Sequence, residues 1–338
     1  MSKFTRRLQK IGSSILVSLP KQWVDAHNLS KSSQVQIETS ENSLSITAGE
    51  GKKLSKEIEI EYPLPNEENI AANITGAYLL GYDIIKINGK STISVKDREI
   101  IRESMRRLVG MEILDEDASN ITGQFLLDET SLNPEKIFKR MSSIALGMFD
   151  ETLSALTTGD STNLQTIPNR DDEINRQYFL LIRFIRSTMV DRRLDGIFNL
   201  ENIDILDYRI AGNILETAGD TIVDLSKSIS DTSLSGTDQK KIYEIAKDIE
   251  QIQKKSIDAF ITNNRSLAIE AIKLHRQYQD KIAKTRSSLE QKKQAPIAFL
   301  NLIYTFEKIA QSWSDISDLV QPTSVSYTHL TLPTILLV

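Results

Sequence analysis

The 338-residue chain contains no cysteine, which excludes disulfide bridges, thiolate metal sites and cysteine nucleophiles. It also lacks an apolar run of the roughly 18 residues that a membrane-spanning helix needs. Charged residues at the amino end are not followed by an apolar segment, so this end does not read as a secretion signal. These absences predict a soluble, cytoplasmic protein with no membrane insertion.

Aromatic residues are scarce as well, at 6% of the chain. Long spans rich in Ile, Leu, Glu, Lys and Gln favour helices over a β-sandwich. The sequence offers no Ser/His/Asp set, no Walker loop and no glycine-rich dinucleotide turn. His275 stands alone in a helical segment, where a solvated side chain is the ordinary expectation. We therefore expect no enzymatic activity.

Positive charge is concentrated at the amino end. Residues 3–31 hold six Lys and Arg and one acid, Asp25, for a net charge of 6 − 1 = +5. The whole chain carries −5, so the remaining residues sum to −5 − 5 = −10. Such asymmetry predicts a basic head that binds nucleic acid and an acidic body.

Residues 4–47 have the pattern of a small β-rich unit. Strands are expected at 4–10 and 15–19, with Gly12 in the turn between them and a short helix after Pro20. Alternating apolar residues at 35–46 predict a hairpin. A unit of about 45 residues buries too little surface to be secure alone, so we expect an intertwined homodimer.

This unit resembles the DNA-binding domain of the AbrB/SpoVT family, which has a swapped-hairpin fold. The resemblance covers about residues 3–48 and depends on RLQKIG at 7–12 and VSLPKQW at 17–23. When the family's DNA-contacting positions are matched to this sequence, the resemblance implies that four basic side chains face DNA. Each of them would release condensed counterions from a phosphate. They are Arg6, Arg7, Lys10 and Lys21. The other reading is a solvated basic strand edge that opposes aggregation.

Residues 49–130 alternate between strand and helix patterns. Strands are expected at 58–62, 82–87, 112–115 and 121–127, and helices at 67–80 and 94–109, the second capped by Ser94. The segment carries no catalytic motif. We interpret it as a small α/β unit that couples the basic head to the body.

From residue 131 to 322 the apolar period is helical. Six segments are expected, at 134–158, 169–196, 202–230, 237–263, 265–292 and 295–320. Their short links favour a tandem pair of three-helix bundles. The predicted fold class is thus multidomain and mainly α, with the β domain at 1–48. Residues 325–338 resemble a translated sequencing adapter and are predicted to be foreign.

The third helical segment carries an acidic row, Glu216, Asp220 and Asp224. Four-residue spacing stacks these carboxylates along one side of a helix, where repulsion costs roughly 0.2–0.5 kcal/mol per pair. A cation bound by hard oxygens would offset that repulsion. Asp171 and Asp172, on the preceding segment, are further candidate ligands.

The other reading of this row is a solvated face. A helical wheel centres the apolar stripe on Leu206, Ile210, Ile214, Ala218, Ile222 and Leu225. Glu216 and Asp220 fall roughly opposite that stripe and are expected to be exposed.

Both acidic segments resemble the PhoU family, through DDEINR at 171–176, YR at 208–209 and ETAGD at 216–220. The resemblance implies a six-helix tandem bundle with acidic rows that can hold a divalent or ferric ion on the outside. Asn175 stands where the family commonly has an acid, and Gln311 interrupts the second row between Glu307 and Asp315. One weaker metal site is therefore expected rather than two.

The sequence thus predicts a DNA-binding transcriptional regulator of phosphate uptake and homeostasis. Its partners would be DNA, a second copy of the chain, and phosphate-transport or signalling proteins. Only the resemblance to PhoU implies that phosphate is the signal. Two alternatives stay open: a PhoU-type interaction adaptor that does not bind DNA, and a metal-binding helical protein. The second lacks the Glu-x-x-His motif of di-iron bundles.

Overall fold

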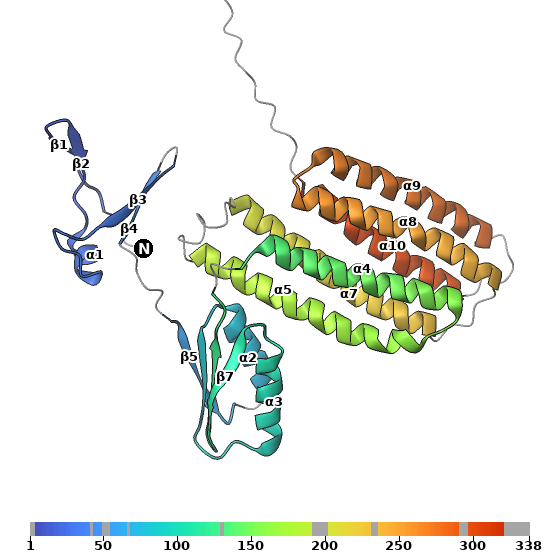
Figure 1. Cartoon of the computed structure of the whole chain (residues 1–338), viewed down its shortest axis with the longest axis horizontal. Coiled ribbons are helices and arrows are strands. Elements are labelled where there is room, and N and C mark those ends of the chain that lie inside the picture. The colour runs from blue at the N-terminus through green and yellow to red at the C-terminus, as the bar shows by residue number, and fades with distance from the viewer. Residues whose placement is uncertain are drawn as a thin grey trace, which may run out of the picture. The chain divides into compact units, whose positions relative to one another are not determined.

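The computed structural model describes residues 4–40, 43–48, 55–65, 68–128, 132–190, 202–230, 236–290 and 297–320. The predicted foreign tail at 325–338 and the end of the predicted helix at 169–196 lie outside these residues. The chain divides into two compact units, Met1–Ser55 and Lys56–Val338 (Figure 1). The prediction of a mainly helical chain with small sheets at its amino end is confirmed.

The first unit consists of two hairpins and a short helix. Its elements are β1 (Gln9–Ile11), β2 (Ser14–Leu16), α1 (Lys21–Ala26), β3 (Val35–Ser40) and β4 (Ser43–Ala48). Strands β1 and β2 pair antiparallel around Gly12, whose φ of 63° suits the turn. They are shorter than the predicted strands at 4–10 and 15–19, and the side chains of both are exposed. The unit therefore has little core of its own.

The second unit begins with an α/β part. Its elements are β5 (Glu57–Tyr62), α2 (Ile70–Leu79), β6 (Ile84–Gly89), α3 (Val95–Arg106), β7 (Met111–Glu116) and β8 (Asn120–Phe125). The sheet order is β5-β6-β8-β7; β5 runs parallel to β6, and the other pairs are antiparallel. Both helices lie on the same side of the sheet in Figure 1. Alternation along the strands buries Ile60, Ile85, Ile87 and Ile121 in the core.

Local sequence sets the helix ends of this part. The Asn69 side chain accepts hydrogen bonds from the Ala71 and Ala72 amides at the start of α2. At α3 the Ser94 hydroxyl accepts from the Asp97 amide, which confirms the predicted cap. Each cap satisfies a backbone donor that the first helical turn leaves without a partner.

Long helices form the rest of the second unit. They are α4 (Pro134–Thr158), α5 (Ile167–Val190), α7 (Asn202–Ser230), α8 (Gly236–Ile261), α9 (Arg265–Glu290) and α10 (Ile297–Asp318), with the 3-10 turn η2 (Thr162–Thr166) before α5. Asn133 caps α4, and Gly159, at φ 74°, ends it. None of the described helices has the length and apolar character needed to span a membrane.

The helices share one continuous core. Helices α4, α5 and α7 pack together, and so do α8, α9 and α10. Helix α10 also packs on α7, and α4 on α8, so the two groups of three helices form one layered body (Figure 1). Aromatic side chains cross this boundary: the Phe149 and Phe306 rings meet edge to face, with centroids 6.1 Å apart.

A buried arginine on α5 joins the helices to the α/β part. Arg183 donates hydrogen bonds to the Tyr78 carbonyl at 3.0 Å, the Tyr82 carbonyl at 2.8 Å and the Asp83 carboxylate at 2.8 Å. Its guanidinium lies 3.9 Å from the centroid of the Phe125 ring. The other Asp83 oxygen accepts from the amide of Lys56, the first residue of this unit. These contacts fix α5 on the sheet.

Candidate functional site

The helical part contains a buried acid, Asp171, in the first turns of α5. Its side chain is buried, and Oδ2 accepts a 3.1 Å hydrogen bond from the Asn175 amide. The second oxygen, Oδ1, has no hydrogen-bond partner within the described part of the chain. A Cβ at residue 219 of α7 would lie 2.7 Å from this oxygen, so Gly219 is what lets the carboxyl approach α7 closely.

Burial is the main cause that raises the pKa of Asp171 to about 7. The negative charges of Asp220, Glu216 and Asp172 add to the rise, in that order. Burial also raises the pKa of Glu216, with a second contribution from Asp220. The structure thus brings four of the five predicted ligand residues into one electrostatic cluster, which we call the α5/α7 acidic cluster: Asp171, Asp172, Glu216 and Asp220.

The fifth predicted ligand, Asp224, lies apart from this cluster. Its side chain is 75% exposed, and its ion-pair partner is Lys227 on the same helix, at 3.6 Å. Two turns of helix separate it from Glu216, and the α7 residues between them that face inward are apolar. The four-residue spacing of acids along α7 therefore does not by itself indicate which of them belong to the cluster.

The predicted apolar stripe of α7 was misplaced by part of a turn. Leu206 and Ile210, which were expected to centre it, are 52% and 38% exposed. Ala218, Ile222 and Leu225 of the predicted stripe do face the core, together with Ala211 and Leu215, which were not part of it. This rotation leaves Glu216 half-buried, contrary to prediction, and Asp220 exposed as predicted.

Two glycines explain the rotation of α7. A Cβ at Gly212 would lie 2.8 Å from the Leu181 side chain of α5, and Gly219 meets Asp171 in the same way. The seven-residue spacing places both glycines on one side of α7, where the backbones of α5 and α7 come close. This pair of glycines was the available sequence signal, and the helical wheel, which centred the stripe on aliphatic residues, did not use it.

The acidic cluster does not provide a ready ligand set for a metal ion. Among the described residues, no three His, Cys, Asp or Glu side chains are grouped closely enough to hold one. Hard cations such as Ca²⁺ take six or more oxygen ligands. Metal binding at the cluster stays a prediction.

Both acids of the corresponding row in the second half of the bundle have polar partners. Glu307 on α10 forms an ion pair with Arg286 of α9, and the Gln311 amide donates to Asp315 at 2.6 Å. His275 lines a cavity of about 230 Å³ next to this row and is buried, contrary to the expectation of a solvated side chain. Burial lowers the pKa of His275. The expectation of one metal site rather than two stays a prediction.

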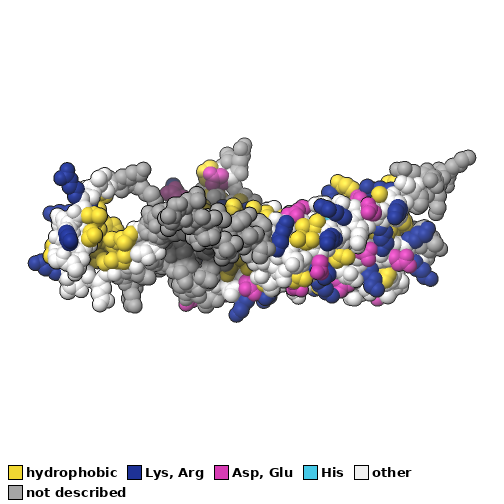
Figure 2. Space-filling view, turned by 90° about the horizontal axis from the view of Figure 1, so that it is seen from above, with side chains coloured by type: hydrophobic (Ala, Val, Ile, Leu, Met, Phe, Trp, Pro, Cys, Tyr) yellow, Lys and Arg dark blue, Asp and Glu magenta, His cyan; other side chains and the backbone are white. Residues whose placement is uncertain are grey.

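The four predicted DNA-contacting cations lie on the first unit. Arg6, Arg7, Lys10 and Lys21 are all exposed, and none forms an ion pair with another described residue. Exposed apolar side chains of Leu8, Ile11 and Ile15 lie on the same unit. Figure 2 shows apolar side chains gathered in one area of this unit, with Lys and Arg side chains around it. Binding of DNA and of a second copy by this unit stays a prediction.

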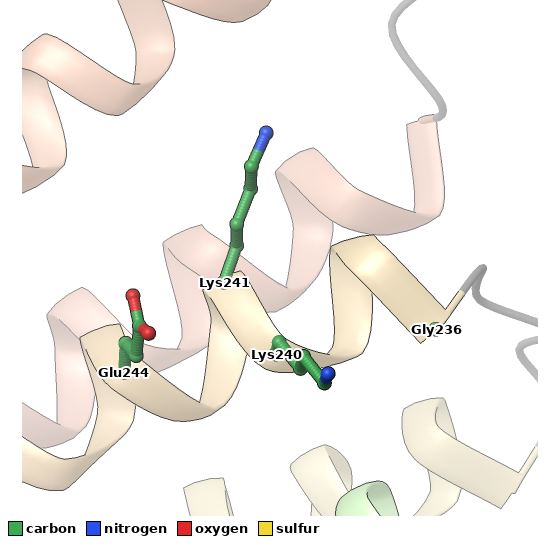
Figure 3. A pocket seen from close by; sticks show the side chains of 4 residues that line it. All are labelled: Gly236, Lys240, Lys241 and Glu244. Carbon is green, nitrogen blue, oxygen red and sulfur yellow. The ribbon is translucent and has the colours of Figure 1, made fainter.

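A hollow beside the start of α8 offers no comparable arrangement. It is lined by Gly236, Lys240, Lys241 and Glu244. Figure 3 shows that the side chains of Lys240 and Lys241 extend in different directions rather than toward one point. We assign no function to this hollow.

Comparison with known proteins identifies part of the helical body. Residues 138–229, which span α4, α5 and α7, match the family model of the PhoU domain. The fold is similar to PhoU from Pseudomonas aeruginosa, with a TM-score of 0.47 and 17% identity over 55% of this chain and 93% of that chain. The phosphate transport system regulatory protein PhoU from Streptococcus pneumoniae is similar with a TM-score of 0.46 and 17% identity, over 55% of this chain and 91% of that chain. The search of curated proteins gave no match.

The family match includes the whole acidic cluster and confirms the predicted PhoU resemblance for residues 138–229. The matched model does not reach residues 1–48. The AbrB resemblance and the swapped-hairpin dimer therefore stay predictions.

Proposed function

We propose that this chain is a regulator of phosphate transport that acts through protein contacts made by its helical part. The observation that carries the proposal is the PhoU domain at residues 138–229. This reading corresponds to the adaptor alternative from the sequence and does not require DNA binding.

An exposed apolar stripe on α7 supports a protein partner. Ile203, Leu206 and Ile210 are all exposed, and their spacing of three and four residues places them on one side of the helix. Exposed apolar groups of this kind favour burial against another protein. We propose that a component of phosphate uptake binds this stripe, which we call the α7 stripe.

Phosphate uptake by cells that lack the gene tests this function. Loss of the chain should change how the uptake rate depends on external phosphate, and restoring the chain should reverse the change. Uptake that responds to phosphate identically with and without the chain would contradict the proposal.

A second function is favoured by the first unit. We propose that it binds DNA as a homodimer, through Arg6, Arg7, Lys10 and Lys21. The supporting observation is that these four cations are exposed beside apolar side chains that a second copy could cover. A gel shift with random duplex DNA at low salt separates this function from a pure adaptor, which would leave the duplex unshifted.

Metal binding at the acidic cluster is a separate proposal. Asp171, Asp172, Glu216 and Asp220 would have to move closer together to bind a divalent or ferric ion, since they form no ligand group as they stand. Elemental analysis of the purified chain, with Asp171→Asn as the comparison, decides whether an ion is held there.

A further inference from the structure

A cavity of about 480 Å³ lies between α3 of the α/β part and α5 of the PhoU domain. Its volume falls within the range of about 300–1,000 Å³ that is typical of small-molecule sites. It is lined by Glu103, Arg106 and Arg107 from α3 and its C-terminal end, and by Asp172, Asn175, Arg176 and Phe179 from α5. Of these residues, Asp172 also belongs to the α5/α7 acidic cluster; the other six have no role in the functions proposed above.

The lining residues of α3 and of α5 each lie on the side of their helix that faces the cavity. On α3 the lining positions are 103, 106 and 107, and on α5 they are 172, 175, 176 and 179. Both sets follow the spacing of three and four residues that defines one face of a helix. Each helix therefore presents a whole face to the cavity rather than a single chance side chain.

Hydrogen bonds between the helices hold the two walls of the cavity together without a ligand. Nε of Arg176 donates a 3.2 Å hydrogen bond to the carbonyl of Arg107, which directly links α5 to the end of α3. Farther along α5, Arg183 and Arg186 donate to carbonyls at the C-terminal end of α2. A cavity with fixed walls binds with a smaller loss of conformational entropy.

The charge of the lining favours an anion. Three arginines and two acids line the cavity, for a formal 3 − 2 = +1 in a chain that carries −5 overall. Arg106 is 72% exposed, and its nearest carboxylate, on Glu99, is 4.0 Å away. Arg107 pairs with Glu103 at 3.3 Å, also in an exposed position. Exposed pairs contribute only about 0–1 kcal/mol, so a phosphate can compete for both guanidinium groups.

The remaining wall is aromatic and polar. Phe179 is partly buried and presents a ring on which a planar group could stack. Asn175 lies one turn before Phe179 and Asp172 two turns before it, and they offer an amide and a carboxylate. Guanidinium groups, an aromatic face and hydrogen-bonding groups at its edge together match the phosphate, base and ribose of a nucleotide.

We propose that this cavity binds a nucleotide, with its phosphates against Arg106 and Arg107 and its base against Phe179. Such a ligand would touch both α3 and α5 and would therefore link the α/β part to the PhoU domain. The proposal does not depend on the phosphate-transport function or on DNA binding.

Calorimetric titration of the full chain with ATP and, separately, with inorganic phosphate tests the proposal. ATP should bind saturably at one site per chain and more tightly than inorganic phosphate. The double variant Arg106→Ala/Arg107→Ala should bind ATP at least tenfold more weakly. Phe179→Leu should weaken ATP binding severalfold and leave any binding of inorganic phosphate unchanged.

Arg276→Ala is the matched control, because Arg276 is an exposed arginine on α9 and does not line the cavity. Its ATP affinity should equal that of the wild type. Absence of saturable ATP binding at millimolar concentration would overturn the proposal. So would equal affinity for ATP and inorganic phosphate, or wild-type affinity in the double arginine variant.

Discussion

At the scale of single residues, the environment of Asp171 decides its chemistry. The sequence indicated only a candidate metal ligand, but α7 covers the carboxyl and three other acids face it. Burial and like charge both favour the protonated form. An acidic row is visible in a sequence, whereas the contact between two helices that buries one member of it is not.

Asp171 should make the stability of the chain depend on pH. The pKa is about 7 in the folded state and that of an ordinary carboxyl in the unfolded state, so the folded chain binds the proton more tightly. Stability should therefore fall as pH rises from about 4 to about 7 and then level off. Asp171→Asn should lose this pH dependence. Its free energy of unfolding, measured relative to that of the wild type, should therefore increase by on the order of 2 kcal/mol from pH 5 to pH 8.

Urea unfolding at a series of pH values, with EDTA present, measures this difference. Asp224→Asn is the control, because that acid lies outside the cluster and is exposed. Parallel pH profiles for wild type and Asp171→Asn would show that the carboxyl is not held in its neutral form.

Arg183 is the second residue whose role the sequence did not indicate. It is an arginine on α5 with no exposed surface, and its partners are about 100 positions away along the chain. Arg183→Ala would leave the buried Asp83 carboxylate without its guanidinium partner and should cost about 3–5 kcal/mol of unfolding free energy.

Chemical denaturation compares Arg183→Ala with Arg276→Ala, which should change stability by less than about 0.5 kcal/mol. Arg183→Lys should be intermediate, since one ammonium group cannot reproduce the fork geometry. Wild-type stability in Arg183→Ala would refute the joining role of this residue.

At the scale of elements, the sequence predicted helix ends well and helix faces less well. The predicted segments 134–158 and 202–230 match the bounds of α4 and α7, and at α4 the signals are local, namely the Asn133 cap and Gly159. The face of α7 depends on Gly212 and Gly219 meeting α5, which is a tertiary contact. Strand patterns at 58–62 and 82–87 also identified β5 and β6 to within a few residues.

Gly219→Ala tests the close approach of α5 and α7. The added methyl would lie 2.7 Å from Asp171 and 3.1 Å from Ile174, so we expect a loss of about 1–3 kcal/mol. Gly76→Ala on α2 is the matched control because nothing lies within 4 Å of its added methyl. That change should stabilise the chain by about 0.5–1 kcal/mol through helix propensity.

Thermal and denaturant unfolding of both glycine variants measures the two changes in stability, which are expected to have opposite signs. Stabilisation by Gly219→Ala would mean that α5 and α7 can separate without cost, and the account of Asp171 burial would then be wrong.

At the scale of the whole molecule, charge is divided between the two units. The sequence established that division, and the structure adds that the basic residues are exposed and the first unit has little core. Whether two first units interleave depends on a second chain, which a single sequence does not specify. The same limit applies to the partner of the α7 stripe.

DNA binding by the first unit should depend steeply on salt. Each phosphate contact contributes about 0.9 to the slope of log affinity against log salt. The triple variant Arg6→Ala/Arg7→Ala/Lys10→Ala should bind random duplex DNA more weakly and with a shallower slope. Lys31→Ala, an exposed lysine of the same unit outside the predicted set, should leave the slope nearly unchanged.

A salt titration followed by fluorescence anisotropy gives both slopes. An identical slope in the triple variant and the wild type would remove these three residues from the DNA interface.

Regulation of phosphate transport by the PhoU domain, through the α7 stripe, is the function that we propose. Its most direct test is the phosphate-dependent uptake rate in cells lacking the gene, complemented with Ile210→Glu or with Ile269→Glu. These isoleucines are similarly exposed, at 38% and 41%, but only Ile210 lies on the stripe. We predict that Ile269→Glu restores wild-type uptake and that Ile210→Glu, though folded and present at the same level, does not. Equal restoration by both variants would contradict the claim.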